Sequence, residues 1–295
     1  MRLSRILHLL DLTPREAWRL LRRRLPVLRA GPAWTADELL QSAKHVRGIR
    51  YAEHLLRHEA IARRHVGWKQ LDFAGRRVVE IGCGPLAGYG PLAVFCGAAS
   101  YQSAEPEWSG DLFFSEAVTS RYLKVLHADL TALYGERMSF PEFRTALRER
   151  MLIHVAPFDA APIEGPVDVV LSQSVLEHVF PPEAVIDKLV AIHGPATRHL
   201  HLVDFGNHYP TAHAFDGLYD QDPDAYIRDR GKAINLLRVP DILRLFQSRG
   251  LPAVGIPIRA LDVDPGRVSP WWRRYETDDL RIQLALICVT GSGVS

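Results

Sequence analysis

A glycine-rich turn directly after a short apolar run constrains this chain more than any other feature of the sequence. The run Arg77–Ile81 has the valine-rich character of a buried strand, and Gly82-Cys83-Gly84-Pro85-Leu86-Ala87 follows it at once. Glycines at such a point let the backbone turn sharply and approach a ligand closely. Because ligands of open α/β sheets bind beyond the carboxyl ends of the strands, the turn predicts a ligand site at the end of this strand.

The rest of the chain alternates short β-rich runs with helical ones. Besides Arg77–Ile81, strands are predicted at Ser100–Ala104, Met151–Ala156, Val167–Ser172, His199–Phe205, Ala253–Arg259 and Arg281–Val289. The segment 107–150 is mostly helical in character and longer than a simple crossover needs, so we expect a helical insertion there. This alternation predicts a Rossmann-like α/β fold, with a mostly parallel seven-stranded sheet and helices on both of its faces.

The first 70 residues have a different composition. Apolar residues recur there at helical spacing, and residues 1–30 hold eight arginines against only Asp11 and Glu16. We predict an N-terminal helical extension, residues 1–70, that caps the domain formed by residues 71–295. The alternative is that the basic helices of residues 1–30 contact an anionic membrane surface peripherally.

Charge and cysteine content exclude several classes of protein. The formal net charge of +2 is too small to favour nucleic acid as a partner. The three cysteines are scattered without metal-binding spacing, which argues against a disulfide framework or a structural zinc. No apolar run is long enough to span a bilayer, and the start lacks the pattern of a secretory signal. We therefore expect a cytoplasmic protein, with membrane association as the open alternative.

Two carboxylates near the glycine turn indicate the kind of ligand. Glu80 lies two residues before Gly82, where it would face a cationic group such as the ammonium or sulfonium of S-adenosylmethionine and would repel a pyrophosphate. Glu105 ends the second predicted strand, about 20 residues beyond the glycines, where an acid can accept both hydroxyls of a ribose. Gly82, Gly84 and Ala87 also satisfy the spacing of dinucleotide-binding turns, so the glycines alone leave that alternative open.

With the segment Asp168–Val179 and its Leu-Glu-His ending, these features resemble the class I S-adenosylmethionine-dependent methyltransferases over roughly residues 75–205. The resemblance implies S-adenosylmethionine as the cofactor. The residues it would place around that cofactor are Glu80, Gly82, Gly84, Glu105, Phe158, Asp159 and Ser172. In this reading Glu105 holds the ribose, Phe158 flanks the adenine and Asp159 accepts its amino group. If Tyr122–Asp129 were the third strand instead, Asp129 would take the adenine role.

Candidates for acid–base chemistry follow the fourth and fifth predicted strands. Methyl transfer to a hydroxyl requires removal of its proton, which a histidine or a carboxylate within hydrogen-bond reach can provide. We predict His178 or His208 as the general base, with Asp204 orienting the base or the acceptor. His201 falls on the opposite face of its strand from Asp204, so we expect it to be a hydrogen-bonded core residue.

The segment 206–238 is predicted to be an insertion on the acceptor side. It loosely resembles a bacterial subgroup of the family that is associated with glycan clusters, which implies polysaccharide biosynthesis, a sugar or glycan hydroxyl as acceptor, and Asn235 and Arg238 as polar contacts to it. Its aspartates do not match the order of a calcium-binding loop, so no metal site is predicted. Two alternatives stay open: N-, C- or O-methylation of a small natural product, and a non-catalytic adaptor that keeps the fold.

Overall fold

The computed structural model describes residues 34–43, 48–209 and 211–291. Residues 1–30, for which a helical cap was predicted and peripheral membrane contact was the alternative, lie outside these ranges. No helix within them is both long enough and apolar enough to cross a bilayer.

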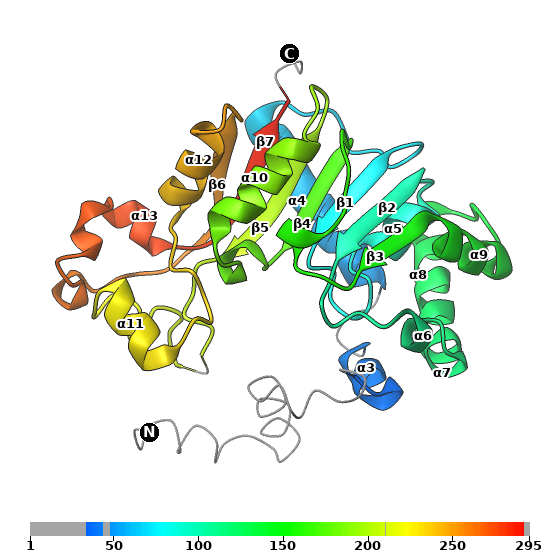
Figure 1. The fold of residues 1–295 in the computed structure, drawn as a ribbon, viewed down its shortest axis with the longest axis horizontal. Coiled ribbons are helices and arrows are strands. Elements are labelled where there is room, and N and C mark those ends of the chain that lie inside the picture. Colours follow the sequence, from blue (N-terminus) through cyan, green and yellow to red (C-terminus); the bar gives the residue numbers. More distant parts are fainter. Residues whose placement is uncertain (1–33, 44–47, 210, 292–295) are drawn as a thin grey trace.

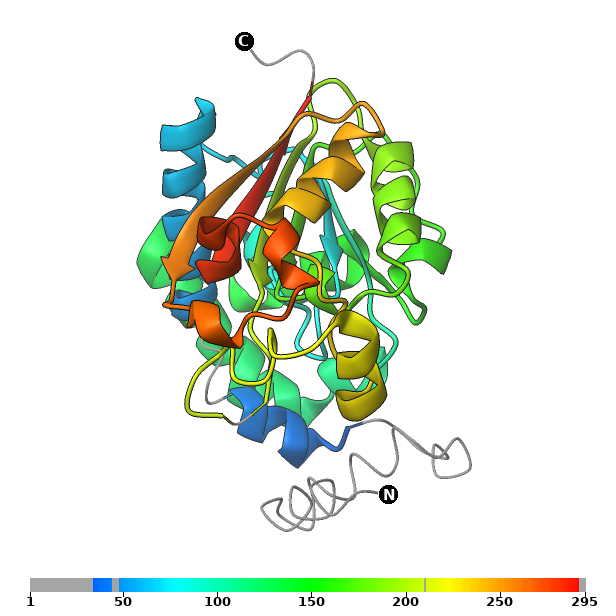
Figure 2. The same ribbon diagram turned by 90° about the vertical axis from the view of Figure 1, so that its left-hand side faces the viewer.

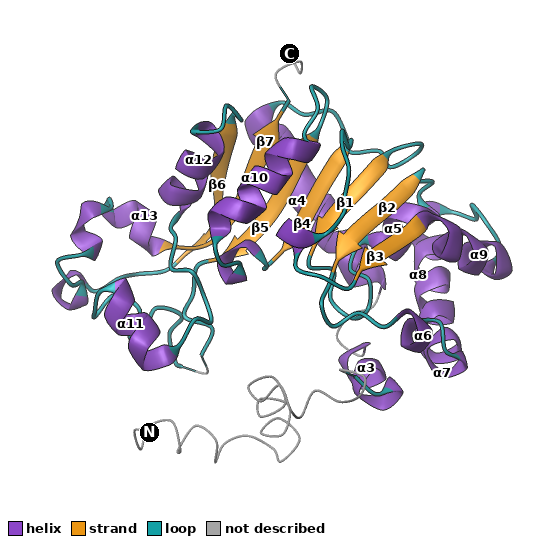
Figure 3. Ribbon diagram, viewed as in Figure 1, coloured by secondary structure: helices purple, strands orange, loops and turns teal. Residues whose placement is uncertain are grey.

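A seven-stranded sheet forms the centre of the molecule (Figures 1 and 3). Its strands are β1 (Arg77–Ile81), β2 (Ser100–Ala104), β3 (Met151–His154), β4 (Val169–Gln173), β5 (Arg198–Asp204), β6 (Ala253–Ala260) and β7 (Ile282–Thr290). They are ordered β3-β2-β1-β4-β5-β7-β6. The strands therefore lie within a few residues of the predicted ones, and the fold class is the expected α/β arrangement.

The sheet is mixed, which the sequence did not indicate. β1 to β5 pair in parallel, whereas β7 is antiparallel to both β5 and β6. The connection between β6 and β7 explains the reversal. Parallel neighbours need a crossover that passes over a face of the sheet, usually a helix. Residues 261–281 hold only two short 3₁₀ turns and the five-residue helix α13 (Thr277–Arg281), so the chain turns back at the same edge.

Helices cover both faces of the sheet. One face packs against α4 (Gly48–Val66), α5 (Gly90–Phe95), α8 (Lys124–Tyr134) and α9 (Phe140–Arg150), and the other against α10 (Pro182–Ile192) and α12 (Val239–Gln247). Alternate strand residues serve the two layers: Val78 and Val169 belong to the first core cluster, and Val79 and Val170 to the second. The burial of both faces explains why these strands read as continuous apolar runs.

The described part of the N-terminal extension consists of α3 (Ala36–Ala43) and α4. Ala52, Leu55 and Ala62 of α4 are buried in the core cluster that the sheet shares with α5 and α8. This helix is thus one of the layers of the α/β domain.

The predicted insertion between β2 and β3 is helical. It contains α6 (Gly110–Phe113), α7 (Glu116–Val118), a π-helical turn (Thr119–Leu123), α8 and α9. The alternative third strand Tyr122–Asp129 is wrong because this segment lies in helix, with Leu123, Leu126 and Leu130 buried at helical spacing. Asp129 consequently lies in a helix rather than at the end of a strand.

A third, smaller core lies beside the ends of β5, β6 and β7. It is built from residues 206–238, including α11 (Pro223–Arg230), and from the β6–β7 connection. Tyr219, Tyr226 and Trp272 are buried at its centre. Figure 2 shows α11 (yellow) below the ends of these strands and the β6–β7 connection (orange to red) in front of their lower part. This third core holds the segment after β5 in place.

Candidate active site

The glycine turn after β1 lies at the point where the strand order reverses, since β1 pairs with β2 on one side and with β4 on the other. Gly82 and Gly84 have φ values of +63° and +65°, a conformation that favours glycine. A Cβ on Gly82 would lie 2.9 Å from Val175 Cγ1, so this residue packs on the segment after β4. Near Gly84 the structure describes no atom within 4 Å of the corresponding position. Gly84 therefore faces open space where a ligand could approach the backbone.

Glu80 requires a correction, because its carboxylate points into the interior instead of toward a ligand. The residue is 2% exposed, and its Oε2 accepts hydrogen bonds from Tyr89 N at 2.8 Å and from the Tyr101 hydroxyl at 2.7 Å. Burial raises the pKa of the Glu80 carboxyl to about 7, although these two hydrogen bonds oppose the rise. Glu80 thus holds the loop after the glycines through its hydrogen bond with Tyr89 N.

Glu105 lies beside the glycine turn, as predicted from its place after β2. The backbone N–H of Gly84 donates to Glu105 Oε2 at 3.0 Å, and that of Glu107 donates to Oε1 at 3.0 Å. The two predicted residues Gly84 and Glu105 are thus brought together although 21 positions separate them. Their contact leaves an acidic group next to the open side of the turn.

Two of the other residues assigned to the cofactor are core residues. Phe158, predicted to flank the adenine, is 5% exposed and packs in the cluster between the sheet and α10. Ser172 is 3% exposed, and its hydroxyl forms a hydrogen bond of 2.8 Å with His201 Nδ1. Asp159, in contrast, is exposed just after β3. Because β1, β2, β3 and β4 are parallel, Asp159, Glu105 and the glycine turn follow the same edge of the sheet.

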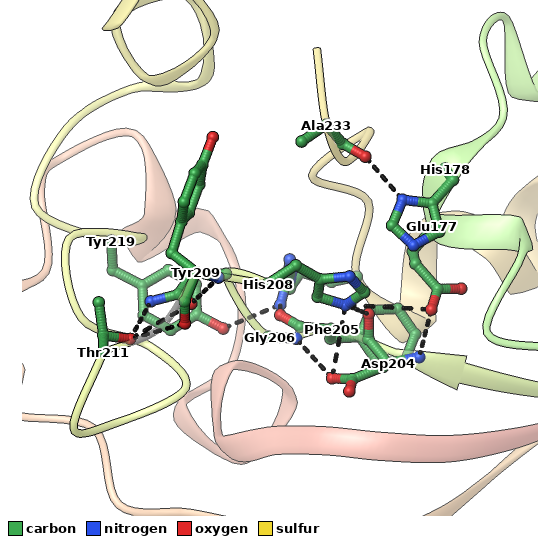
Figure 4. A network of polar contacts seen from close by, with 12 residues as sticks. Glu177, His178, Asp204, Phe205, Gly206, His208, Tyr209, Thr211, Tyr219 and Ala233 are labelled. Atoms are coloured by element: carbon green, nitrogen blue, oxygen red, sulfur yellow. Dashed lines mark hydrogen bonds and ion pairs between the residues drawn. The ribbon is translucent and has the colours of Figure 1, made fainter. Parts of the chain in front are cut away.

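Four polar residues come together at this edge (Figure 4), at the end of β5 and after β4 and β5. We call them the carboxylate–histidine cluster: Glu177, His178, Asp204 and His208. The His178 and His208 rings lie 4.7 Å apart, centroid to centroid. His208 Nε2 is 3.9 Å from Asp204 Oδ1 and 4.0 Å from Glu177 Oε1. The three residues predicted for acid–base chemistry are therefore neighbours, and Glu177 joins them.

Glu177 was not predicted as a site residue. It is 3% exposed, and its Oε1 accepts a hydrogen bond of 3.3 Å from Asp204 N. Its Oε2 has no hydrogen-bond partner among the described residues. Burial raises the pKa of the Glu177 carboxyl to about 8, and the nearby Asp204 charge adds to the rise. The signal available in the sequence was its position beside His178 in the strand-four segment, but its burial depends on the packing of residues 206–238.

The backbone fixes both histidines of the cluster. His178 Nδ1 lies 2.7 Å from the carbonyl oxygen of Ala233, so this nitrogen carries the hydrogen and Nε2 keeps its lone pair. His208 has a φ of +55°, which a residue with a Cβ rarely adopts. Such strained positions are concentrated at functional sites, where the surrounding structure holds them.

Asn235 and Arg238, predicted as polar contacts to the acceptor, form hydrogen bonds within the protein. Asn235 Nδ2 donates to Leu176 O at 2.7 Å, and its backbone N–H donates to Glu177 O at 2.7 Å. Arg238 is 1% exposed and donates from Nη1 to Phe205 O at 2.8 Å and to the Tyr219 hydroxyl at 3.1 Å.

The Arg238 guanidinium also lies 5.3–5.5 Å from the ring centroids of Phe205, Tyr219 and Trp272. Its charge is thus held by aromatic faces and by oxygen acceptors inside the third core. Both residues tie the segment after β5 to the rest of the molecule.

The aspartates of residues 216–224 do not gather into a site. Asp216 accepts a hydrogen bond from His213 N, Asp222 caps α11 through Ala225 N, and Asp220 pairs with Arg267. Asp216 and Asp222 thus contact neighbours in their own segment, and Asp220 contacts the β6–β7 connection.

Comparison with known proteins gives structural likeness only. No family model matches the chain, and no curated protein matches it. Similar solved structures include an S-adenosylmethionine-dependent methyltransferase from Mesorhizobium loti, 14% identical, with a TM-score of 0.43 over 79% of this chain and 97% of that one.

A phosphoethanolamine N-methyltransferase from Haemonchus contortus with bound S-adenosylhomocysteine is 14% identical, with a TM-score of 0.45 over 79% of this chain and 52% of that one. The 1,6-didemethyltoxoflavin-N1-methyltransferase of Burkholderia thailandensis is 13% identical, with a TM-score of 0.38 over 80% and 76% of the two chains. At these values the comparison by itself assigns no activity to this chain.

Proposed function

We propose that this chain is an S-adenosylmethionine-dependent methyltransferase that methylates a hydroxyl of a small polar acceptor, such as a sugar or a glycan. The proposal depends on one observation: the glycine turn with Glu105 and the carboxylate–histidine cluster lie at the same edge of the sheet. Val175, which contacts Gly82, lies two residues before Glu177 and links the groups.

The donor side suits a nucleoside ligand that carries positive charge. Glu105 follows β2 and Asp159 follows β3, so both carboxylates lie along this edge of the sheet. The backbone of Gly84 is open to a ligand. The helix after the turn, α5, begins only at Gly90 and has six residues, so it offers little to a pyrophosphate. When bound, S-adenosylmethionine supplies a methyl group on a sulfonium whose sulfur leaves as a neutral thioether.

The acceptor side favours oxygen as the methylated atom. A hydroxyl must lose its proton as it attacks, whereas a neutral amine already has a nucleophilic lone pair. His178 can take that proton at Nε2, because its Nδ1 donates to Ala233 O. The nearby Asp204 carboxylate stabilises the imidazolium that results. His208 donates from Nε2 to Asp204 O at 3.3 Å and lies against the His178 ring. Because Asn235 and Arg238 are structural, the choice of a sugar depends on this hydroxyl chemistry and on the subgroup resemblance.

The donor site is tested by replacing Glu105 with alanine. We expect the affinity for S-adenosylhomocysteine to fall by roughly tenfold or more, since hydrogen bonds to a charged group contribute about 1.5–3 kcal/mol. Isothermal titration calorimetry measures this affinity. Glu164→Ala, at an exposed position before β4, removes the same charge and serves as the control. Equal affinities of wild type and Glu105→Ala would contradict the donor site.

The acceptor site is tested with Asp204→Asn and with the double variant His178→Ala/His208→Ala. We expect kcat to fall by about 10²–10⁴, the usual contribution of a positioned base, with little change in S-adenosylhomocysteine affinity. Transfer of a tritiated methyl group to cell-envelope glycans and to small-metabolite pools gives the rate. The exposed His65 at the end of α4 supplies the control variant His65→Ala. Undiminished turnover in the double variant would rule out the assignment of the base.

The same assay separates the alternatives. Mass spectrometry of the labelled product distinguishes an O-methyl from an N- or C-methyl group. A chain that binds S-adenosylhomocysteine but methylates none of the pools would instead act as an adaptor that keeps the fold.

A further inference from the structure

Three side chains of the carboxylate–histidine cluster present possible metal ligands to one point (Figure 4). Glu177 and His178 follow β4 and His208 follows β5, and one ligand atom from each lies within 4.8 Å of the other two. Donor atoms bind a divalent transition metal at about 2.0–2.2 Å in a tetrahedral arrangement, so donors around one ion lie about 3.3–3.6 Å apart. The described atoms, within 4.8 Å of one another, have to approach by about an ångström to share an ion.

The surroundings prepare His178 for this role. Its Nδ1 is engaged by Ala233 O at 2.7 Å, which leaves the Nε2 lone pair for a ligand. Histidines that bind metals commonly donate their other ring nitrogen to a backbone carbonyl or a carboxylate, which fixes the tautomer and the ring orientation.

The buried carboxylate of Glu177 is a second and independent indication. The residue is only 3% exposed, and its Oε2 lacks a hydrogen-bond partner among the described residues. A buried polar atom without a partner costs free energy and calls for an explanation such as an ion. The left-handed backbone of His208, which brings its ring toward this carboxylate, adds a strained residue at the same place.

We propose that Glu177, His178 and His208 bind a divalent first-row transition-metal ion. Two imidazoles and one carboxylate favour such an ion over Mg²⁺ or Ca²⁺, which prefer oxygen ligands throughout. No metal was predicted here, because Glu177 and His208 are 31 positions apart and only the packing of the two loops joins them.

The proposal goes beyond methyl transfer and does not require it. If the acceptor hydroxyl binds the ion, its pKa falls and its proton is easier to remove. The two histidines then act as ligands instead of bases. Asp204, whose Oδ1 is 3.9 Å from His208 Nε2, would accept the hydroxyl proton while the oxygen lone pair forms the new bond to carbon.

Metal binding is tested on the full chain without a methyl donor. After treatment with a chelator and dialysis, the protein is titrated with Co²⁺, and the visible d–d absorption of the bound ion is recorded. We expect one saturable site, displaced by Zn²⁺ and unaffected by an equal concentration of Mg²⁺. Glu177→Gln, His178→Ala and His208→Ala should each weaken Co²⁺ binding by roughly tenfold or more.

Two controls keep the result interpretable. Glu177→Gln retains a side-chain oxygen that can accept from Asp204 N, and its thermal unfolding and circular dichroism verify the fold. His65→Ala removes a histidine elsewhere and should bind Co²⁺ as the wild type does. Absence of a saturable site, or affinity unchanged in all three cluster variants, would overturn the proposal. Binding of S-adenosylhomocysteine is measured separately, without metal. Its result tests the methyltransferase proposal and leaves the metal proposal unaffected.

Discussion

At the scale of single residues, the two buried glutamates differ in how their carboxylates are satisfied. Oε2 of Glu80 receives hydrogen bonds from Tyr89 N and the Tyr101 hydroxyl, whereas Oε2 of Glu177 receives none from the described residues. Both residues lie directly at or after strand ends of the same sheet edge. We assign Glu80 to loop architecture and Glu177 to the acceptor side for this reason.

The ionisation of Glu80 should make stability depend on pH. Its pKa is raised by burial from an unfolded value near 4.5 to about 7, so the folded state loses stability as pH rises through this range. Glu80→Gln keeps a side-chain oxygen for both donors and has no charge to bury. Relative to wild type, we expect its free energy of unfolding to rise by about 2–3 kcal/mol between pH 5 and pH 8.

Urea unfolding of the protein without ligand at both pH values measures this difference. The change in the free energy of unfolding between the two pH values should be the same for Glu164→Gln, at an exposed site, as for wild type. If this change is also the same for Glu80→Gln as for wild type, the interpretation is wrong.

At the scale of elements, the strands could be predicted and the side-chain roles could be predicted only in part. Apolar runs buried on both faces, followed by glycine or acidic residues, located the strands within a few residues. The roles of Asn235 and Arg238 were inferred from their spacing in the chain. That spacing carries no information on which way a side chain points. Asn235 bonds to the segment after β4, and Arg238 lies inside the third core.

Asn235 joins the elements that carry the two halves of the carboxylate–histidine cluster. We expect Asn235→Ala to lower kcat more than it lowers S-adenosylhomocysteine affinity, because the glycine turn lies outside the contact. Loss of its partly buried hydrogen bonds should destabilise the protein by about 0.5–1.5 kcal/mol.

Hydrogen exchange measured by mass spectrometry should show faster exchange in residues 206–238 of this variant. Asp224→Asn, an exposed change on α11 in the same segment, is the matched control. Unchanged exchange and unchanged kcat in Asn235→Ala would show that the contact does not hold the cluster.

At the scale of the whole molecule, both layers contain buried neutral histidines. Burial lowers the pKa of His58 on α4 to about 4 and that of His201 on β5 to about 3. In the unfolded chain histidines take up protons near pH 6.5, so the unfolded state binds more protons than the folded state below that pH. Each such histidine should reduce stability by up to about 1.4 kcal/mol per pH unit between pH 6.5 and its folded pKa.

His201→Gln tests this acid sensitivity, since glutamine can still form a hydrogen bond with Ser172 but does not titrate. We expect the variant to be less stable than wild type at pH 7 and to lose less stability between pH 7 and pH 5. The comparison with wild type is needed because Glu80 and Glu177, with raised pKa values, shift stability the opposite way over this range. Identical pH slopes in chemical denaturation would contradict the prediction.

The sequence by itself determined the α/β class, the positions of the strands, and the edge at which glycines, acids and histidines gather. These follow from local periodicity and from the rule that parallel strands end on the same side of a sheet. The tertiary structure alone decided the reversal of β7, the inward direction of Glu80, Phe158, Ser172 and Arg238, and the approach of Glu177 to His208. The physical reason is that burial and side-chain direction depend on packing between segments far apart in the chain, which local patterns do not encode.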